Sequence, residues 1–430
     1  MSVYSHRMYQ QQLDLATPQE WTELVPKGLL AEVARAHGGD QAQGKLTAPV
    51  HFWVLVVATL SKGCSSLKDL LSRFQARFGS LWGLPKGDKP WVSPAALSQR
   101  NKERPLAFWQ AMYQRLRQHH FASGWLRKAW QKKFLALEAL DSSTFRLMAR
   151  LRGVFAPSGS GGAKKGSKNK KGALKIHQVY HVGAELPADV AIGPARQHDA
   201  KGWKKALKQL RKGVLYLIDR GYCSFELWRD IDDAWAYFIT PLKEGMVYEH
   251  LRWLNPKRQR ERVRDELVLF PGMTTQEDFY ILRLVQIRQE DGTWWSYVTN
   301  LIDDELTPAD VQEIYRLRWR IEIFFRHLKH TLNMEHWFAE SEAGVQAQLY
   351  AALIAYLLSQ VVLLWVSREA RRPPEQFRFT TVVHELAEWL VSQLYHNRLL
   401  ELRDLRERVR RNATEQDLRR NSQYHQPLPA

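Results

Sequence analysis

The stretch KFLALEALDSSTF, residues 133–145, decides the fold class of this chain. It is an apolar run of strand length, and we expect the strand to stop at Asp141. A second run, VLYLIDRGY at 214–222, is rich in aliphatic and β-branched residues and should stop at Asp219. The sequence therefore predicts two buried strands that each end at an aspartate.

The segments around these strands alternate between strand and helix patterns. We expect a β-hairpin at 172–193, a helix at 199–212 capped by Asp199, a helix in SFELWRDIDD and a strand at 234–243. The order β-β-β-α-β-α-β predicts an α/β domain, in which helices cover the faces of a mixed sheet.

A β-rich segment interrupts this domain. The basic run HLRWLNPKRQRERVRDE precedes two alternating segments, DFYILRLVQI and GTWWSYVTNL, which are typical of strands. Helix should resume at Pro308, with Thr307 as its cap. We therefore expect an inserted β-rich subdomain between two parts of one α/β domain.

The charge balance indicates a polyanionic partner. Lys and Arg number 63 against 45 acids, a net charge of +18. Such a surface attracts nucleic acid first and anionic membrane second, although a basic protein that is merely soluble has the same composition. The two cysteines exclude a disulfide framework, and the N-terminus has no signal-peptide pattern, so we expect a cytoplasmic protein.

One segment is apolar enough to raise the question of a membrane. LYAALIAYLLSQVVLLWVS, residues 349–367, has no charged residue and is nearly long enough to span a bilayer. Ser359 and Gln360 lie at its centre, and no second span follows. A buried core helix is therefore the prediction, with no membrane contact.

A lysine-rich loop precedes the predicted hairpin. Residues 156–175 are Gly, Ser and Lys with almost nothing apolar, which is typical of a mobile loop. A solvated linker would have this composition, and so would an arm that DNA phosphates order. The lysines expected to bind DNA are Lys164, Lys165, Lys168, Lys170 and Lys171.

The segment YRLRWRIEIFFRHLK, residues 315–329, carries both an apolar stripe and a polar ridge. On one continuous helix, Tyr315, Arg318, Glu322 and Lys329 fall within about 60° of one another. A solvated face with intrahelical ion pairs would also place them there. Glu322 is the only acid in residues 314–334, however, and it lies among arginines.

The two strand-end aspartates and Glu322 together suggest a metal site. Each aspartate alone is commonly a turn or cap residue. Two carboxylates at the ends of strands and a third on a helix packed over the sheet would form the oxygen-rich pocket that Mg²⁺ and Mn²⁺ prefer. Two such ions about 4 Å apart can drive phosphodiester displacement.

At this point the sequence resembles a known family. The spacing Tyr315-x2-Arg318-x3-Glu322-x6-Lys329 is similar to the Y-R-E-K signature of bacterial insertion-sequence DDE transposases of the insertion-sequence-four-like family. LDSST around Asp141, IDRGY around Asp219 and YVTNL before the helix resemble other blocks of that family, in the same order.

The resemblance implies an RNase H-like catalytic domain that uses two Mg²⁺ ions, for which Mn²⁺ can substitute. Asp141, Asp219 and Glu322 would be the catalytic and metal-binding residues. The implied reaction cuts the ends of an insertion sequence and joins them to target DNA. Two alternatives stay open: a silent DNA-binding derivative of a transposase, and a nuclease on the same fold.

The resemblance also implies which residues bind DNA. Tyr315, Arg318 and Lys329 would grip the phosphate at the 5′ end of the element, and Trp295, with Trp294 second, would stack on a flipped base. An aromatic edge strand is the alternative explanation for the tryptophans. The expected partners are the terminal inverted repeats, the target DNA and a second copy of the chain on DNA.

These observations predict five regions. Residues 1–132 are expected to be a helical DNA-end-binding domain, 133–243 the first part of the catalytic core, and 244–300 the β-rich insertion. The second part of the core, with the Glu322 helix, should span 301–372. Residues 373–430 are expected to be helical and to contact DNA or a second subunit.

Overall fold

The computed structural model divides the chain into two compact units. The helical unit comprises residues 1–121 and 326–430, and the sheet unit comprises residues 122–325. Within them, the structure describes residues 24–26, 28–38, 46–61, 66–78, 91–120, 133–157, 172–196, 204, 207, 209–271, 280–302, 306–372 and 374–396. The predicted lysine arm, most of the helix predicted at 199–212 and the arginine-rich C-terminus lie outside these residues.

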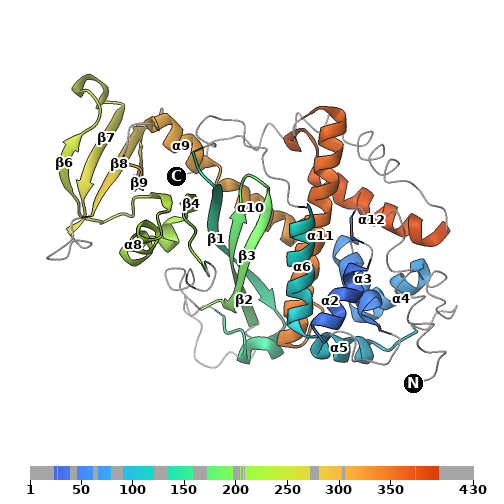
Figure 1. The fold of residues 1–430 in the computed structure, drawn as a ribbon. Helices are drawn as coiled ribbons and strands as arrows, with labels where there is room; N and C mark the ends of the chain where they lie inside the picture. Colours follow the sequence, from blue (N-terminus) through green and yellow to red (C-terminus); the bar gives the residue numbers. More distant parts are fainter. Residues whose placement is uncertain are drawn as a thin grey trace. The chain divides into compact units, whose positions relative to one another are not determined.

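The sheet unit is built on a single sheet whose described strands follow the order β3-β2-β1-β4-β5-β9-β8-β7-β6 (Figure 1). The strands are β1 (Ala136–Leu147), β2 (Gly172–His181), β3 (Leu186–Pro194), β4 (Val214–Ile218), β5 (Tyr237–Pro241), β6 (Glu249–Trp253), β7 (Val263–Leu269), β8 (Ile281–Arg288) and β9 (Trp294–Thr299).

Strand directions identify the class of fold. β1, β4 and β5 run parallel, whereas β2 and β3 continue antiparallel on the other side of β1. This is the strand arrangement of an RNase H-like fold, which confirms the predicted fold class. The β-rich insertion continues the same sheet, because β9 pairs with β5 and β6 to β9 form an antiparallel meander.

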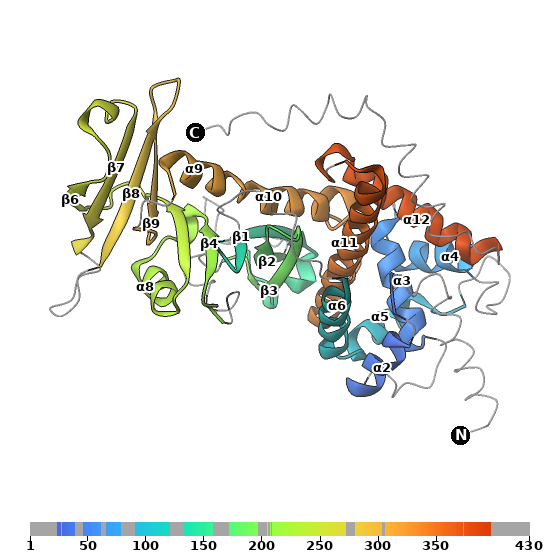
Figure 2. The same ribbon diagram turned by 45° about the horizontal axis from the view of Figure 1, so that its top comes forward.

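Helices cover both faces of this sheet. On one face α8 (Phe225–Asp233), capped by the Ser224 hydroxyl, buries Trp228 in a cluster with apolar residues of β1, β4 and β5. On the other face lie α9 (Pro308–Arg316) and α10 (Trp319–Arg326), which follow one another along the sheet in Figure 2. Tyr180 of β2 contacts Phe324 of α10, with ring centroids 5.4 Å apart.

The predicted cap of α9 is present as a full capping box. The Thr307 hydroxyl accepts from the Asp310 N–H at 3.2 Å, and the Asp310 carboxylate accepts from the Thr307 N–H at 2.9 Å. Pro308 occupies the first turn, where its missing N–H is not needed.

The prediction of one continuous helix through residues 315–329 is wrong. Between α9 and α10, the N–H groups of Leu317 and Arg318 bond to carbonyls three residues back, at 3.0 and 2.9 Å. This tighter turn ends one helix and begins the next. After α10 the chain forms a π-helical turn, η7 (His327–Thr331), so the ideal helical phase does not extend from Tyr315 to Lys329.

The helical unit has the uncharged segment at its centre. Its described helices are α2 (Leu29–Ala36), α3 (Ala48–Leu60), α4 (Leu67–Phe78), α5 (Pro94–Glu103), α6 (Leu106–His120), α11 (Glu342–Ala370) and α12 (Phe379–His396). The long helix α11 contacts α3, α5, α6 and α12 (Figure 1). It is the one described helix with the length and hydropathy of a membrane span, but 89% of its most apolar window is buried inside the protein. A core helix passes the same test.

The two units group the chain differently from the five expected regions. The N-terminal helices and the helices after residue 326 belong to one unit, because α11 and α12 pack on α3 and α4. The predicted second part of the core, 301–372, is divided at residue 326.

Candidate active site

Asp141 and Asp219 lie on the same face of the sheet, where the parallel pairing of β1 and β4 ends. The β1–β4 pairing ends with Leu140 opposite Ile218, and both of these residues face α8 in the core cluster. Because side chains alternate along a strand, the next residue of each strand faces the opposite side, where α9 and α10 lie.

Only one of the two aspartates ends its strand. Asp219 directly follows β4, as predicted, and its Oδ2 accepts from the Gly221 N–H at 2.9 Å. Asp141 was expected to end β1 as well, and that expectation is wrong. β1 continues to Leu147 because β2 goes on pairing with it past the end of β4, with Gln178 opposite Asp141.

Arg318, from the turn before α10, brings the three predicted carboxylates together. Its Nη1 lies 3.0 Å from the Asp141 Oδ2 and 3.6 Å from the Asp219 Oδ1. Its Nη2 forms an ion pair with Glu322, four residues further along the chain. The Arg318 side chain is only 10% exposed, so this cation is largely withdrawn from water.

The surroundings of this cluster change the proton affinities of its members. Burial raises the pKa of Asp141 to about 7; Arg318 acts to lower it, and Asp219 and Glu322 act to raise it. Burial acts to lower the pKa of Arg318, but Tyr315 and the three carboxylates raise it overall. Arg318 therefore stays cationic, and Asp141 keeps its proton to a higher pH than an ordinary aspartic acid does.

The donor set fits a hard divalent cation, with one adjustment. Three carboxylates already surround a positive charge, and oxygen ligands are those that Mg²⁺ and Mn²⁺ prefer. Among the described residues, however, no group of three or more His, Cys, Asp or Glu side chains is spaced to hold a metal ion. The guanidinium lies between the carboxylates, so a metal requires Arg318 to move away.

Tyr315 also reaches this cluster, and Lys329 belongs to the other unit. The buried Tyr315 hydroxyl donates to the Ile218 carbonyl at 3.4 Å, and burial raises the pKa of Tyr315. Its ring packs on Tyr297 of β9, with centroids 5.1 Å apart. Lys329 lies in η7, where partial burial lowers its pKa and Glu335 acts to raise it.

Trp294 and Trp295 point to opposite faces of β9, because they are consecutive residues of one strand. The Trp294 ring lies under Arg264 of β7, whose guanidinium carbon is 4.4 Å from the centroid. Trp295 shares its face with Tyr297 and thus with Tyr315. Both tryptophans are half-buried.

The comparison with protein families identifies the family of this chain. Residues 137–358, more than half of the chain, match the family model described as a transposase DDE domain. The chain belongs to the DDE transposase family.

Two similar proteins are also named as transposases. The transposase for insertion sequence element IS231B of Bacillus thuringiensis is 23% identical over 398 residues, which cover 81% of this chain and 80% of that protein. A protein named as a transposase, y4zB of Sinorhizobium fredii, is 29% identical over 224 residues, 49% of this chain and 58% of its own length.

One solved structure aligns weakly with this chain. A chain of the cryo-EM structure of the piggyBac transposase synaptic complex with hairpin DNA aligns with a TM-score of 0.46 and 12% identity. The alignment covers 95% of this chain and 88% of that chain. A likeness this weak supports no argument about the present transposase.

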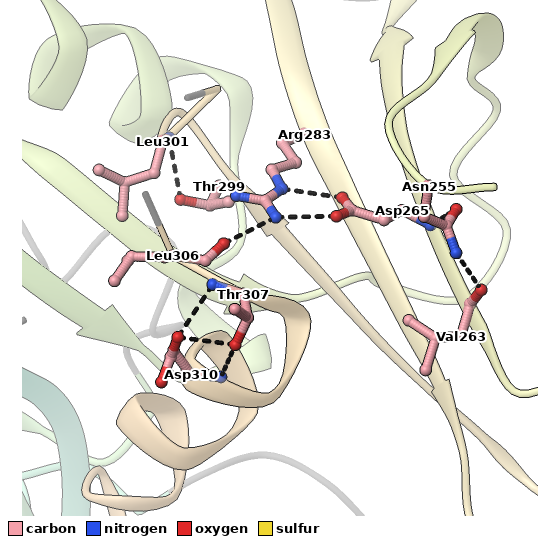
Figure 3. A network of polar contacts seen from close by, with 9 residues as sticks. All are labelled: Asn255, Val263, Asp265, Arg283, Thr299, Leu301, Leu306, Thr307 and Asp310. Carbon is pink, nitrogen blue, oxygen red and sulfur yellow. Dashed lines mark hydrogen bonds and ion pairs between the residues drawn. The ribbon is translucent and has the colours of Figure 1, made fainter. Parts of the chain in front are cut away.

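Sequence reasoning missed a buried ion pair that supports the start of α9, the helix before the turn that carries Arg318. The Arg283 Nε and Nη2 donate to the two carboxylate oxygens of Asp265 at 2.8 Å, and Nη2 also donates to the Leu306 carbonyl at 2.8 Å (Figure 3). Leu306 directly precedes the α9 cap, so β7 and β8 hold the start of that helix. The signal available in the sequence was Arg283 itself, a charged residue at a buried position within the alternating pattern of β8.

Proposed function

We propose that this transposase cuts the ends of an insertion sequence and joins them to target DNA. The observation that supports this most directly is the convergence of Asp141, Asp219 and Glu322 on one cationic position, next to the carboxyl end of β4. Family membership implies that a divalent metal is used. The identity of the ions as two Mg²⁺, with Mn²⁺ as a substitute, is part of the proposal.

The chain's own residues prepare this site in a defined way. When bound, the metal ions activate the attacking oxygen and stabilise the leaving one. Asp141 must lose its proton to contribute a carboxylate, and its pKa of about 7 makes this loss sensitive to pH near neutrality. Arg318 must leave the carboxylates, and its planar fork is then available to hold a phosphate in a bidentate geometry.

DNA binding is proposed for residues around this cluster. Trp295 is the better candidate than Trp294 for stacking on a flipped base, because it shares a face of β9 with Tyr297, which packs on Tyr315. The Trp294 ring already carries the Arg264 guanidinium. Tyr315 and Lys329 are proposed to contact the phosphate at the cut end.

The lysine loop is proposed as a further phosphate contact. Its lysines are Lys164, Lys165, Lys168, Lys170 and Lys171. Because such contacts carry no sequence information, they would hold DNA in register rather than select the site. The partners proposed are the terminal inverted repeats, target DNA and, on DNA, a second copy of the chain. The proposed location is the bacterial nucleoid.

Cleavage of a labelled transposon end in Mg²⁺ tests this function. Asp141→Ala should abolish cleavage and leave binding of the end intact, whereas Asp233→Ala, at an exposed position of α8, should cleave as wild type does. Unchanged cleavage by the Asp141 variant would contradict the proposed triad. Binding without cleavage by the wild type would favour a silent DNA-binding protein, and cleavage without strand transfer would favour a nuclease.

A further inference from the structure

Behind the carboxylates, on the α8 face of the sheet, a buried hydrogen bond joins two residues with no role in the chemistry described above. The His177 Nδ1 lies 2.6 Å from the Tyr222 hydroxyl, and their rings meet edge to face at 5.9 Å. Each residue is 1% exposed. His177 is in β2, opposite Ser142 of β1, and Tyr222 ends the 3₁₀ turn η4 (Arg220–Tyr222).

The turn that Tyr222 ends is what positions Asp219. β4 stops pairing with β1 at Ile218, so Asp219 lies beyond the last paired residue of its strand. Its backbone and side chain instead belong to the turn: the Asp219 carbonyl accepts from the Tyr222 N–H at 2.9 Å, and the Asp219 Oδ2 accepts from the Gly221 N–H. Asp141 differs, because β2 still pairs with it.

The hydrogen bond links this turn to a distant part of the sheet. β2 and β4 are not neighbours, since β1 lies between them. The His177–Tyr222 contact therefore passes behind β1, next to Ser142, and connects the strand that supports Asp141 with the turn that carries Asp219. Both residues belong to the sheet unit.

We propose that Tyr222 and His177 are positioning residues, which hold Asp219 beside Asp141 for metal binding. The inference rests on the proposed function, since it assigns the pair to the metal site. Both side chains lie on the α8 face of the sheet, opposite the face on which Asp141 and Asp219 lie. Loss of the bond removes a buried hydrogen bond that ties the turn to β2, and the turn is then freer to open locally. Groups that orient metal ligands in this way commonly affect metal affinity strongly.

A matched variant separates positioning from ordinary core stability. Tyr216 is a fully buried tyrosine of β4, the strand that leads into the turn, and it lies on the same α8 face as Tyr222. Its hydroxyl accepts from the Arg211 N–H at 3.1 Å. Tyr216→Phe and Tyr222→Phe each remove one buried hydroxyl from one partner. A merely structural role predicts that the two variants behave alike.

Hydrogen exchange measured by mass spectrometry tests the turn without metal or DNA. In Tyr222→Phe, amides of the peptide covering Asp219 to Cys223 should exchange about 5- to 10-fold faster, the change expected for one lost hydrogen bond. Tyr216→Phe should leave this peptide unchanged. Equal exchange in the wild type and Tyr222→Phe would overturn the proposal.

Manganese binding, followed by the loss of the free Mn²⁺ signal in electron paramagnetic resonance, tests the metal site itself. Tyr222→Phe and His177→Leu should each weaken binding about 10-fold, and the double variant should be no weaker than either single one. His177→Asn, whose side chain can still bond the tyrosine, should restore affinity. The positioning role of the pair would be refuted if the losses of Mn²⁺ affinity in the double variant were additive, or if Tyr216→Phe weakened Mn²⁺ binding equally.

The two tests separate this inference from the proposed function. If Asp141→Asn binds Mn²⁺ as the wild type does, the proposed metal site is wrong, and the exchange experiment still decides whether the pair holds the turn. If Asp141→Asn loses Mn²⁺ while Tyr222→Phe keeps wild-type affinity, the metal site stands and the positioning role is refuted.

Discussion

Replacing Asp141 with asparagine should stabilise the folded protein at pH 8 while abolishing its catalytic activity. In the folded state burial raises the pKa of Asp141 to about 7, against the ordinary value of 3.8. Above the folded pKa, the protein must hold an ionised, largely buried carboxylate beside two others. Asparagine has the same shape and no charge, so this unfavourable term disappears.

The direction of the pH dependence follows from which state binds the proton. Below pH 3.8 the carboxyl group is protonated in both states, and the pKa shift costs nothing. Between 3.8 and about 7 the folded state keeps a proton that the unfolded state has released, so stability falls as pH rises. The accumulated penalty is about 1–2 kcal/mol at pH 5 and at most about 4 kcal/mol at pH 8.

Thermal unfolding in EDTA at pH 5 and pH 8 measures this difference. The advantage of Asp141→Asn over wild type should grow by up to about 3 kcal/mol between the two pH values, or up to about 10 °C in Tm for a unit of this size. Asp233→Asn, at an exposed site, controls for the general loss of a carboxylate. An advantage that is the same at both pH values would refute the argument, since Arg318 would then keep Asp141 ionised throughout.

Three further predictions concern the buried ion pair of Arg283 and the proposed DNA contacts. Arg283→Met should destabilise the protein by about 3–5 kcal/mol in urea unfolding, because it leaves Asp265 charged and buried. Replacing both Arg283 and Asp265 with apolar residues should recover part of this loss. Trp295→Ala should impair cleavage at transposon ends more than Trp294→Ala, measured as the single-turnover rate on a labelled end; equal losses would contradict the assignment by strand face. Lys329→Ala should weaken binding of the cut end with little change in Tm, and a large fall in Tm would instead assign Lys329 a structural role.

Local sequence signals were reliable where a few neighbouring residues determine the structure. The cap at Thr307, before Pro308, was predicted and is present. The hairpin at 172–193 is present as β2 and β3, and Asp219 follows its strand as expected. Hydroxyl capping, proline geometry and strand periodicity all act within a few residues of the chain, which explains these successes.

The same local rules failed where a distant segment intervenes. Periodicity predicted one helix from Tyr315 to Lys329, but the chain makes a tight turn at Leu317 and Arg318 that places the guanidinium among the carboxylates. β1 passes Asp141 because β2 pairs with it further along, and no feature of the strand itself indicates this.

The sequence by itself therefore determined the elements, the family and the three acids to suspect. The tertiary structure decided how those acids are arranged: Arg318 reaches Asp141 across 177 residues of chain, and Tyr222 bonds to His177 across 45. It also decided which face of β9 packs on Tyr315, which is the face of Tyr297. Each of these facts depends on strand register and on contacts between segments far apart in the chain, which the periodicity of a single segment does not specify.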